Sequence, residues 1–224
     1  MEPVHFSPLA QQVIPFLGLL CWSAVYGLMV WRGIKDRSFG MPLTALCVNV
    51  VWETVFTFSD GTPPVFRGAN GVWLALDLAV FGTLLKFGRE DYAEPLLREI
   101  FYPLIAFVLL LAAVAVVAFR AAFQDIFGGI SATLTTLLLS AQLPAMLVRR
   151  NSVRGQSLYI GIFVLLGDLA GWAMNHIAKV ASQPNIPILW VNAANVCIIA
   201  ANVLYLALYW RICRRDGVNP WRRL

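Results

Sequence analysis

The chain has 224 residues, of which 59% are hydrophobic and only 13% are charged, and its mean hydropathy is +0.72. Soluble domains carry about 25% charged residues, so this composition excludes an ordinary soluble protein and indicates one embedded in a lipid bilayer. The formal net charge is +5 at pH 7, and no nucleic-acid partner is expected. The four cysteines lie apart without a CxxC pair, which is typical of buried free thiols.

Seven apolar runs follow one another along the chain, each close to the ~20 residues that cross a bilayer as a helix. They cover residues 13–31, 41–58, 71–87, 104–119, 128–148, 157–180 and 186–210. The longest link, residues 88–103, is rich in charges and predicts a short helix at the membrane interface. The sequence therefore predicts an all-α, polytopic membrane protein in which residues 1–224 form a single seven-helix transmembrane domain.

The basic residues are unevenly divided between the two sides of this arrangement. All but three of the 17 Lys and Arg residues fall on one side, the exceptions being Arg67, Arg120 and Lys179. Basic residues accumulate on the cytoplasmic side of membrane proteins. We therefore expect an integral, multi-pass protein with its N-terminus outside and its C-terminus in the cytoplasm.

A weak internal repeat relates the two ends of the chain. Residues 35–43 align without a gap with residues 150–158, and the same shift places the first three runs on the last three. It also places Glu53 on Asp168 and Asp77 on Asn192. This predicts a 3+1+3 parallel repeat, with halves at about 13–87 and 128–210 and a linker helix at about 104–119. Repeats of this kind place their site between the halves.

Glu53 is the most informative acidic residue, because it lies inside the apolar run 41–58. A carboxylate in hydrocarbon is expensive, so it predicts a functional group. Asn49 is four residues earlier and Trp52 is three residues after Asn49, so all three share roughly one helical face. The alternative interpretation is a structural hydrogen bond to a neighbouring helix.

Three further polar residues fall at a similar depth to Glu53. With a rise of ~1.5 Å per residue, Asp77, Asp168 and Asn192 lie in the same central-to-outer slab, which predicts one shared polar pocket, whereas Asn202 is expected to lie deeper, toward the cytoplasmic side. Asp168 lies in a small-xxx-small pattern and Asn192 on an asparagine stripe, so both could instead serve helix packing.

Aromatic rings accompany these acids. Trp73 precedes Asp77 by one helical turn and Phe81 follows it by one, and Trp172 lies one turn after Asp168. The faces of such rings can stabilise a cation. A carboxyl group in apolar surroundings tends to be neutral and can then donate a proton. Together these residues favour acid chemistry in an apolar, aromatic pocket.

Several common catalytic motifs are absent from the sequence. It contains no HExxH, GxSxG or P-loop pattern, no Cys/His cluster, and no Asp-rich run of the kind that binds magnesium diphosphate. We therefore expect no metal and no cofactor, and a reaction that does not begin with metal-triggered loss of diphosphate.

The second run carries the most specific resemblance. Pro42-Leu-Thr-Ala-Leu-Cys-Val-Asn49-Val-Val-Trp-Glu53 resembles the second-span motif of the small seven-helix membrane terpene cyclases of fungal meroterpenoid and indole-diterpene pathways. Residues 73–77, 86–88 and 150–157 look like further motifs of that family. The chain is also similar to bacterial relatives that act on farnesylated indole diketopiperazines of the drimentine type. In length and number of spans, the resemblance covers most of the chain.

The resemblance implies an enzyme of secondary metabolism, a proton-initiated and metal-independent terpene cyclase of isomerase or lyase type. Glu53 would protonate an epoxide or a terminal alkene of a prenyl chain, supplied by an upstream prenyltransferase. The family carries an aspartate in its last span, in an Asp-x-x-Tyr context, but the matching residue here is Asn202. We therefore expect Asp77 or Asp168 to assist Glu53 in catalysis. The expected substrate-binding residues are Asn49, Trp52, Trp73, Phe81, Trp172, Asn192 and Asn202.

A second resemblance points to transport instead. The 3+1+3 layout and Gln142-Leu-Pro144 look like the PQ-loop and SWEET families of small-solute transporters, with Glu53 and Asp168 as symmetric proton or solute carriers. In those families Pro and Gln are adjacent, whereas here Leu143 separates them. The repeat partner of Pro144 is Met29 rather than a second proline, which counts against hinges in both halves.

Overall fold

The computed structural model describes residues 2, 4–60, 64–181 and 186–224, and the regular structure in these ranges is entirely helical. A short helix, α4 (Pro95–Glu99), confirms the helix predicted between residues 88 and 103, and a 3-10 turn covers Pro220–Arg222. The long helices are α1 (Pro8–Asp36), α2 (Leu43–Phe58), α3 (Pro64–Asp91), α5 (Phe101–Phe123), α6 (Gly129–Arg150), α7 (Leu158–Ala181) and α8 (Ile188–Arg215).

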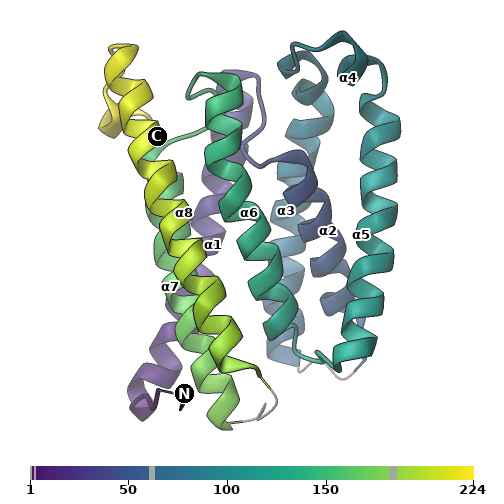
Figure 1. Ribbon diagram of the computed structural model, residues 1–224, viewed down its shortest axis with the longest axis vertical. Coiled ribbons are helices and arrows are strands. Elements are labelled where there is room, and N and C mark those ends of the chain that lie inside the picture. The colour runs from purple at the N-terminus through teal and green to yellow at the C-terminus, as the bar shows by residue number, and fades with distance from the viewer. Residues whose placement is uncertain (1, 3, 61–63, 182–185) are drawn as a thin grey trace.

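The long helices stand side by side, with the N-terminus at one end of the bundle and the C-terminus at the other (Figure 1). Within the described ranges, six of them are long and apolar enough to cross a membrane. The prediction of an all-α polytopic membrane protein is therefore confirmed. The exception in length is α2, which is apolar but has only 16 residues and so extends only ~24 Å.

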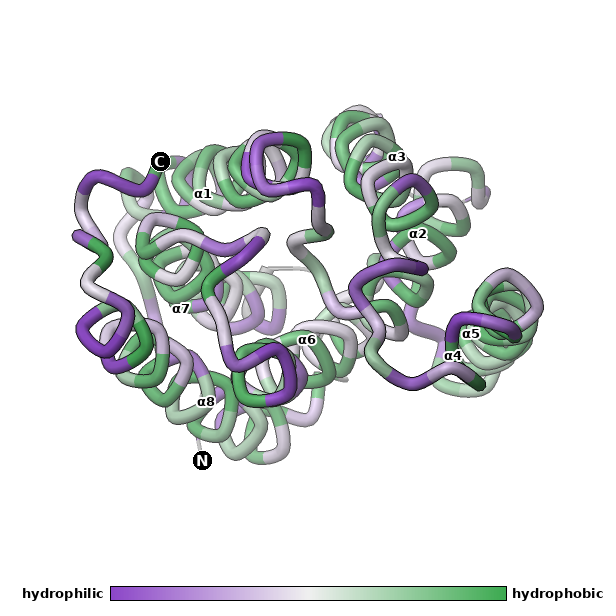
Figure 2. Tube along the Cα trace, turned by 90° about the horizontal axis from the view of Figure 1, so that it is seen from above, coloured by the Kyte–Doolittle hydropathy of each residue, from purple (hydrophilic) through white to green (hydrophobic). Residues whose placement is uncertain are grey.

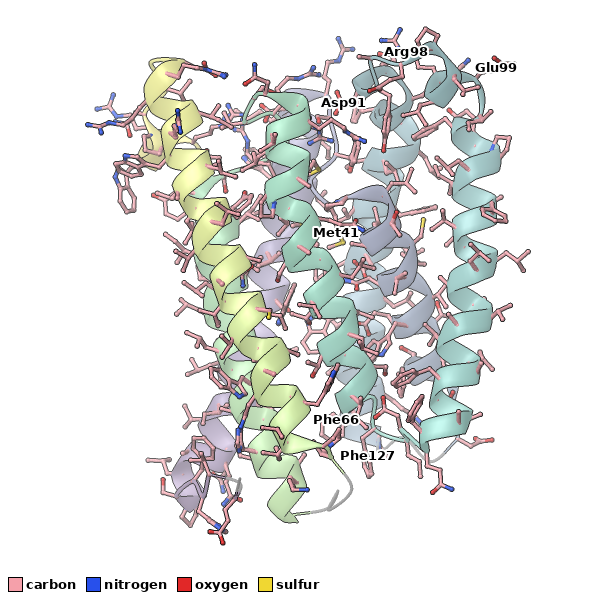
Figure 3. All side chains as sticks on the ribbon, viewed as in Figure 1. Met41, Phe66, Asp91, Arg98, Glu99 and Phe127 are labelled. Carbon is pink, nitrogen blue, oxygen red and sulfur yellow. The ribbon has the colours of Figure 1, made fainter. Side chains whose placement is uncertain are left out.

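Helix α2 is short because it starts inside the bundle. Residues 38–42, which precede it, are non-helical and buried, and Pro42 stands directly before the first helical residue. Figure 3 places Met41 well below the end of the bundle that Asp91 marks. A Cβ on Gly40 would lie 2.7 Å from Met29 Cβ, so this segment packs tightly on α1. Irregular backbone at membrane depth is tolerated when protein covers it, as it does here.

Seen along the helices, α1, α7 and α8 lie on one side, α2, α3 and α5 on the other, and α6 between them (Figure 2). Helix α3 contacts both α1 and α2, and α8 contacts both α6 and α7. The two groups meet directly through α1 and α3, while α6 packs closely on α8 and touches α2 over a shorter length.

Small residues allow α1 and α7 to approach closely. A Cβ on Gly167 would lie 2.9 Å from Trp22 Nε1, and Gly18 faces Ala170 and Met174. Gly171, the second small residue of the predicted packing pattern, has open space beside it. Gly167 alone therefore accounts for the tight crossing next to Asp168.

The loop before α2 and the loop before α7 are tied together at the basic end of the bundle. Gln156 Nε2 donates to the Gly40 carbonyl at 2.5 Å, and Arg150 Nη1 donates to the Phe39 carbonyl at 2.9 Å. The backbone N–H of Gly155 donates to Asp36 Oδ2 at 2.8 Å. These are the segments that the internal repeat aligns, so the aligned loops contact each other directly.

Ion pairs reinforce the same end. Asp91, at the end of α3, pairs with Arg150 at 3.2 Å and with Arg154 at 3.4 Å, and it also accepts a hydrogen bond from the Ser38 hydroxyl. Arg223, near the C-terminus, pairs with Asp36 at 2.5 Å. Buried pairs with additional hydrogen bonds fix geometry even where their net stabilisation is small. The basic end is therefore held in one arrangement.

We predict that Gly155→Ala lowers the melting temperature of the detergent-solubilised protein by several degrees. Gly155 has φ +72°, and a Cβ there would lie 2.6 Å from the Phe39 carbonyl oxygen. The left-handed conformation alone costs a non-glycine residue about 1–2 kcal/mol. Gly217→Ala is the matched control, since Gly217 also has positive φ (+65°) but nothing lies near its Cβ position. Equal melting temperatures for the two variants would show that the loop contact does not stabilise the protein.

Candidate active site

Helix α2 carries Asn49 and Glu53 into the interior of the bundle. Both are buried, with Glu53 only 4% exposed, and their spacing of four residues places them on one helical face as the sequence predicts. Trp52 faces a different neighbour. Its Nε1 donates to Ser131 Oγ of α6 at 2.8 Å, and its ring stacks on Phe56 at 4.5 Å. Trp52 thus contributes to the contact between α2 and α6.

Asp77 of α3 lies within electrostatic range of Glu53. Asp77 is completely buried, and neither of its carboxyl oxygens has a hydrogen-bond partner within the described structure. Glu53 Oε2 also lacks one. Buried polar atoms are nearly always paired, and exceptions call for an explanation such as a catalytic role. The structure therefore brings two of the three predicted acids together with their oxygens available.

Tyr26 of α1 completes this group, although the sequence did not single it out. Its hydroxyl accepts a hydrogen bond from Asn49 Nδ2 at 3.1 Å, and its side chain is buried. The hydroxyl also lies within electrostatic range of Asp77, Glu53 and Asp168. A lone tyrosine in an apolar run gives little signal, but Tyr26 follows Trp22 by one turn, and that aromatic pair marks the inner face of α1.

Two more polar groups extend the site along α2 and α3. Trp73 Nε1, one turn before Asp77, and Thr57 Oγ1, one turn after Glu53, are both buried and lack hydrogen-bond partners in the described residues. Phe81, one turn after Asp77, packs against the main apolar core. The acids therefore lie in a polar strip bordered by rings, together with these unpaired atoms and the Tyr26–Asn49 hydrogen bond. We call Tyr26, Asn49, Glu53, Trp73 and Asp77 the acid site.

Asp168 of α7 belongs to a second polar cluster. Asn202 Nδ2 of α8 donates to Asp168 Oδ2 at 2.6 Å, and Ser140 Oγ of α6 donates to the same oxygen at 3.4 Å. Asp168 and Asn202 are 3% and 1% exposed. The expectation that Asn202 lies deeper than Asp168 is wrong. Helices α7 and α8 run in opposite directions, and the register between them places these two residues opposite each other.

Asn192 lies away from Asp168, near the beginning of α8. Its Oδ1 accepts hydrogen bonds from Trp172 Nε1 at 2.7 Å and is 2.9 Å from His176 Nε2. The prediction of one pocket that includes Asn192 therefore differs from the structure, because Asn192 lies ten residues, ~15 Å along α8, before Asn202, which contacts Asp168. The substrate-binding roles predicted for Trp172 and Asn192 would apply only to a substrate that reaches this end.

Taken together, the fold and the acid site define a multi-pass membrane protein with buried, unpaired carboxyl groups suited to proton transfer. The model of the Pyr4-like transmembrane terpene cyclases matches residues 2–215, and the chain belongs to this family. It is therefore a membrane terpene cyclase. This confirms the family and the class of enzyme that the second-span motif predicts.

Curated relatives support the assignment over most of the chain. Terpene cyclase pyr4 of Aspergillus fumigatus is 27% identical over 218 residues, which cover 88% of this chain and 84% of the relative. Asnovolin H synthase nvfL of Aspergillus novofumigatus is 28% identical over 208 residues, or 84% of each chain. The Pyr4-family terpene cyclase mfmH of Annulohypoxylon moriforme is 32% identical over 98 residues, 43% of this chain and 40% of the relative. No solved structure matches the chain.

We predict that Tyr26→Phe lowers the rate of cyclisation while the protein stays folded. The change removes the acceptor of the Asn49 hydrogen bond and a hydroxyl within electrostatic range of the acids. A hydrogen bond between neutral groups contributes about 0.5–1.5 kcal/mol, so a loss of roughly 2- to 10-fold in kcat/KM is expected. Tyr209→Phe, which removes another buried hydroxyl from α8, is the control and should stay close to wild type. Equal activity of the two variants would remove Tyr26 from the site.

Proposed function

We propose that the enzyme starts cyclisation by protonating a prenyl chain, and that Glu53 supplies the proton. The observation that carries this proposal is the pair of buried carboxyl groups, Glu53 and Asp77, which lie within electrostatic range of each other. Glu53 Oε2 and both oxygens of Asp77 lack hydrogen-bond partners within the described structure. Two negative charges within electrostatic range of each other in an apolar interior are very costly, so at least one of the two carboxyl groups favours holding a proton. That proton is then available to a substrate.

The proposed reaction begins when Glu53 transfers its proton to the distal alkene of the chain, or to the oxygen of a terminal epoxide. The resulting tertiary cation is attacked by the next double bond, and ring closures follow until a base or water removes a proton. With an alkene substrate the proton balance is zero, so the reaction is an isomerisation. Asp77 and Asn49 hold Glu53 in position, and positioned acids of this kind contribute about 10²- to 10⁴-fold to a rate.

Aromatic side chains border the route of the cation. Trp73 and Phe81 flank Asp77 on α3, and the rings of Trp22 and Tyr26 on α1 lie 5.9 Å apart. Cations are stabilised over the faces of such rings. Asp168 is held in a separate cluster with Asn202, so the proposal leaves the first proton transfer to Glu53 and Asp77.

We propose a farnesyl chain on an indole or diketopiperazine group as the substrate. The resemblance of the chain to bacterial cyclases of this kind supports the proposal. An upstream prenyltransferase would make the substrate, which enters from the bilayer or the cytosol.

Two features of architecture accompany the proposal. The equivalent helix order in the two halves, with α3 and α8 each contacting both partners, supports the 3+1+3 parallel repeat. The concentration of basic residues at the end that carries Asp91 and Arg98 supports placing that end in the cytoplasm (Figure 3).

The orientation predicts that green fluorescent protein fused to the C-terminus fluoresces in a bacterial host, while alkaline phosphatase fused there is inactive. Fusions after Gln124, in the link between α5 and α6, should give the opposite pair of results because that link lies at the other end of the bundle. The reverse pattern at both positions would overturn the orientation.

The proposed mechanism predicts that Glu53→Gln lowers cyclisation by about 100-fold or more, since the amide keeps the shape but cannot supply the proton. Asp77→Asn should also be strongly impaired. The assay uses membranes that contain the enzyme, a farnesylated tryptophan diketopiperazine or its terminal epoxide, and product analysis by mass spectrometry and NMR. Glu99→Gln is the matched control, because Glu99 is exposed on α4.

A Glu53→Gln enzyme that cyclises as well as wild type would refute the proposed acid. The transport alternative is tested with the same variants in sealed vesicles. Uptake of a small solute that depends on Glu53, in the absence of any cyclisation, would favour transport. Membership of the cyclase family favours the enzymatic reaction.

A further inference from the structure

The hydrogen bond between Asn202 and Asp168 fixes the orientation of both side chains. Only the amide nitrogen of Asn202 can donate to a carboxylate oxygen, so Nδ2 faces Asp168 Oδ2, at 2.6 Å, and the amide oxygen points elsewhere. Ser140 Oγ also directs its hydrogen bond to Oδ2. Every interaction described for Asp168 in the protein interior is therefore made by one of its two oxygens.

The other two oxygens of this pair lack partners. Asp168 Oδ1 and Asn202 Oδ1 are buried and have no hydrogen-bond partner in the described part of the chain. Both are acceptors, so neither can satisfy the other. Leaving a buried acceptor unpaired is unfavourable, and two on adjacent side chains are more so.

A purely structural polar contact would not require this arrangement. Asn195, two turns earlier on α8, is also buried, and its Nδ2 donates to the Val191 carbonyl of its own helix. Asn195 thus shows how an asparagine on α8 is accommodated without a neighbouring acid. The Asp168–Asn202 pair brings three helices together and still leaves two acceptors open.

We propose that Asp168 Oδ1 and Asn202 Oδ1 form a two-acceptor subsite, which binds a polar part of the substrate that carries two N–H or O–H donors. An indole N–H together with an amide N–H fits this requirement. The subsite assigns Asp168 to binding rather than to proton transfer. The test of the subsite by enzyme turnover rests on the proposed cyclase function, whereas the test by ligand binding does not.

The location of the pair agrees with this role. Asp168 lies within electrostatic range of the Tyr26 hydroxyl, which in turn contacts Asn49 of the acid site. Gly167, next to Asp168, allows α7 to approach Trp22 of α1 closely. In this proposal the polar part of the substrate is held at α7 and α8, and its chain extends past Tyr26 of α1 to Glu53.

Exchanging the two side chains provides a sharp test. In Asp168→Asn, one open acceptor becomes a donor, so KM should rise about 10- to 100-fold with a smaller change in kcat. In the double exchange, Asp168→Asn with Asn202→Asp, the amide at 168 donates to the carboxylate at 202 and two acceptor oxygens stay open. The double variant should therefore recover most of the affinity lost in Asp168→Asn. Asn195→Ala on the same helix is the control.

Methylated probes test the same subsite from the ligand side. The binding of a tryptophan diketopiperazine without a prenyl chain, and of its indole N-methyl and amide N-methyl derivatives, is measured on the detergent-solubilised protein by microscale thermophoresis. Methylation of a donor that reaches the subsite should weaken binding to wild type about 10- to 100-fold. The same methylation should weaken binding less in the Asp168→Asn variant. In the double exchange it should again weaken binding.

The outcomes separate this subsite from the proposed reaction. Binding that depends on the N–H donors, without cyclisation of the prenylated compound, would support the subsite and refute the proposed function. Failure of every probe to bind, or equal binding of methylated and unmethylated probes, would overturn the subsite. So would an Asp168→Asn enzyme with reduced kcat and unchanged KM, since that result would make Asp168 a catalytic residue.

Discussion

The cost of holding carboxyl groups inside a bilayer is the constraint on which the rest of this structure depends. Glu53, Asp77 and Asp168 are each at most 4% exposed, so protein rather than lipid surrounds them. Helices α1, α2 and α3 enclose the first two acids, and α6, α7 and α8 enclose the third. The partners differ, because Asp168 is held by Asn202 whereas Asp77 has no hydrogen bond in the described residues. One acid is anchored while the other pair is left available for chemistry.

Contacts at the basic end of the bundle fix the positions of the helices around these buried acids. The loops before α2 and α7 bind each other through Gln156 and Gly155, and Asp91 gathers Arg150 and Arg154. Strong polar contacts that fix the positions of the helices are thus kept near the membrane surface, away from the acid site. The arrangement also explains why the aligned segments 35–43 and 150–158 contain charges and glycine, since both must turn sharply where the halves meet.

The sequence was sufficient to predict the class of fold, the family and the central acids, because these depend on local patterns. A spacing of four residues places Asn49 and Glu53 on one face whatever surrounds the helix. The pairing of Asp168 with Asn202 was not predictable in the same way. It depends on where α7 ends and α8 begins, and hydropathy locates helix ends only to within a few residues. The apolar run 186–210 predicts a helix over those residues, whereas α8 extends from Ile188 to Arg215. Tyr26 was missed because its role comes from a contact with Asn49 across two helices.

The acid site and the Asp168–Asn202 pair share no helix. Tyr26, Asn49, Glu53 and Asp77 come from α1, α2 and α3, whereas Asp168, Asn202 and Ser140 come from α6, α7 and α8. A substitution of Asp168 or Asn202 therefore replaces no side chain of the acid site. Mutation and selection can act on the two clusters separately, so the compound that is held can change over evolutionary time while the acid that starts the reaction is retained.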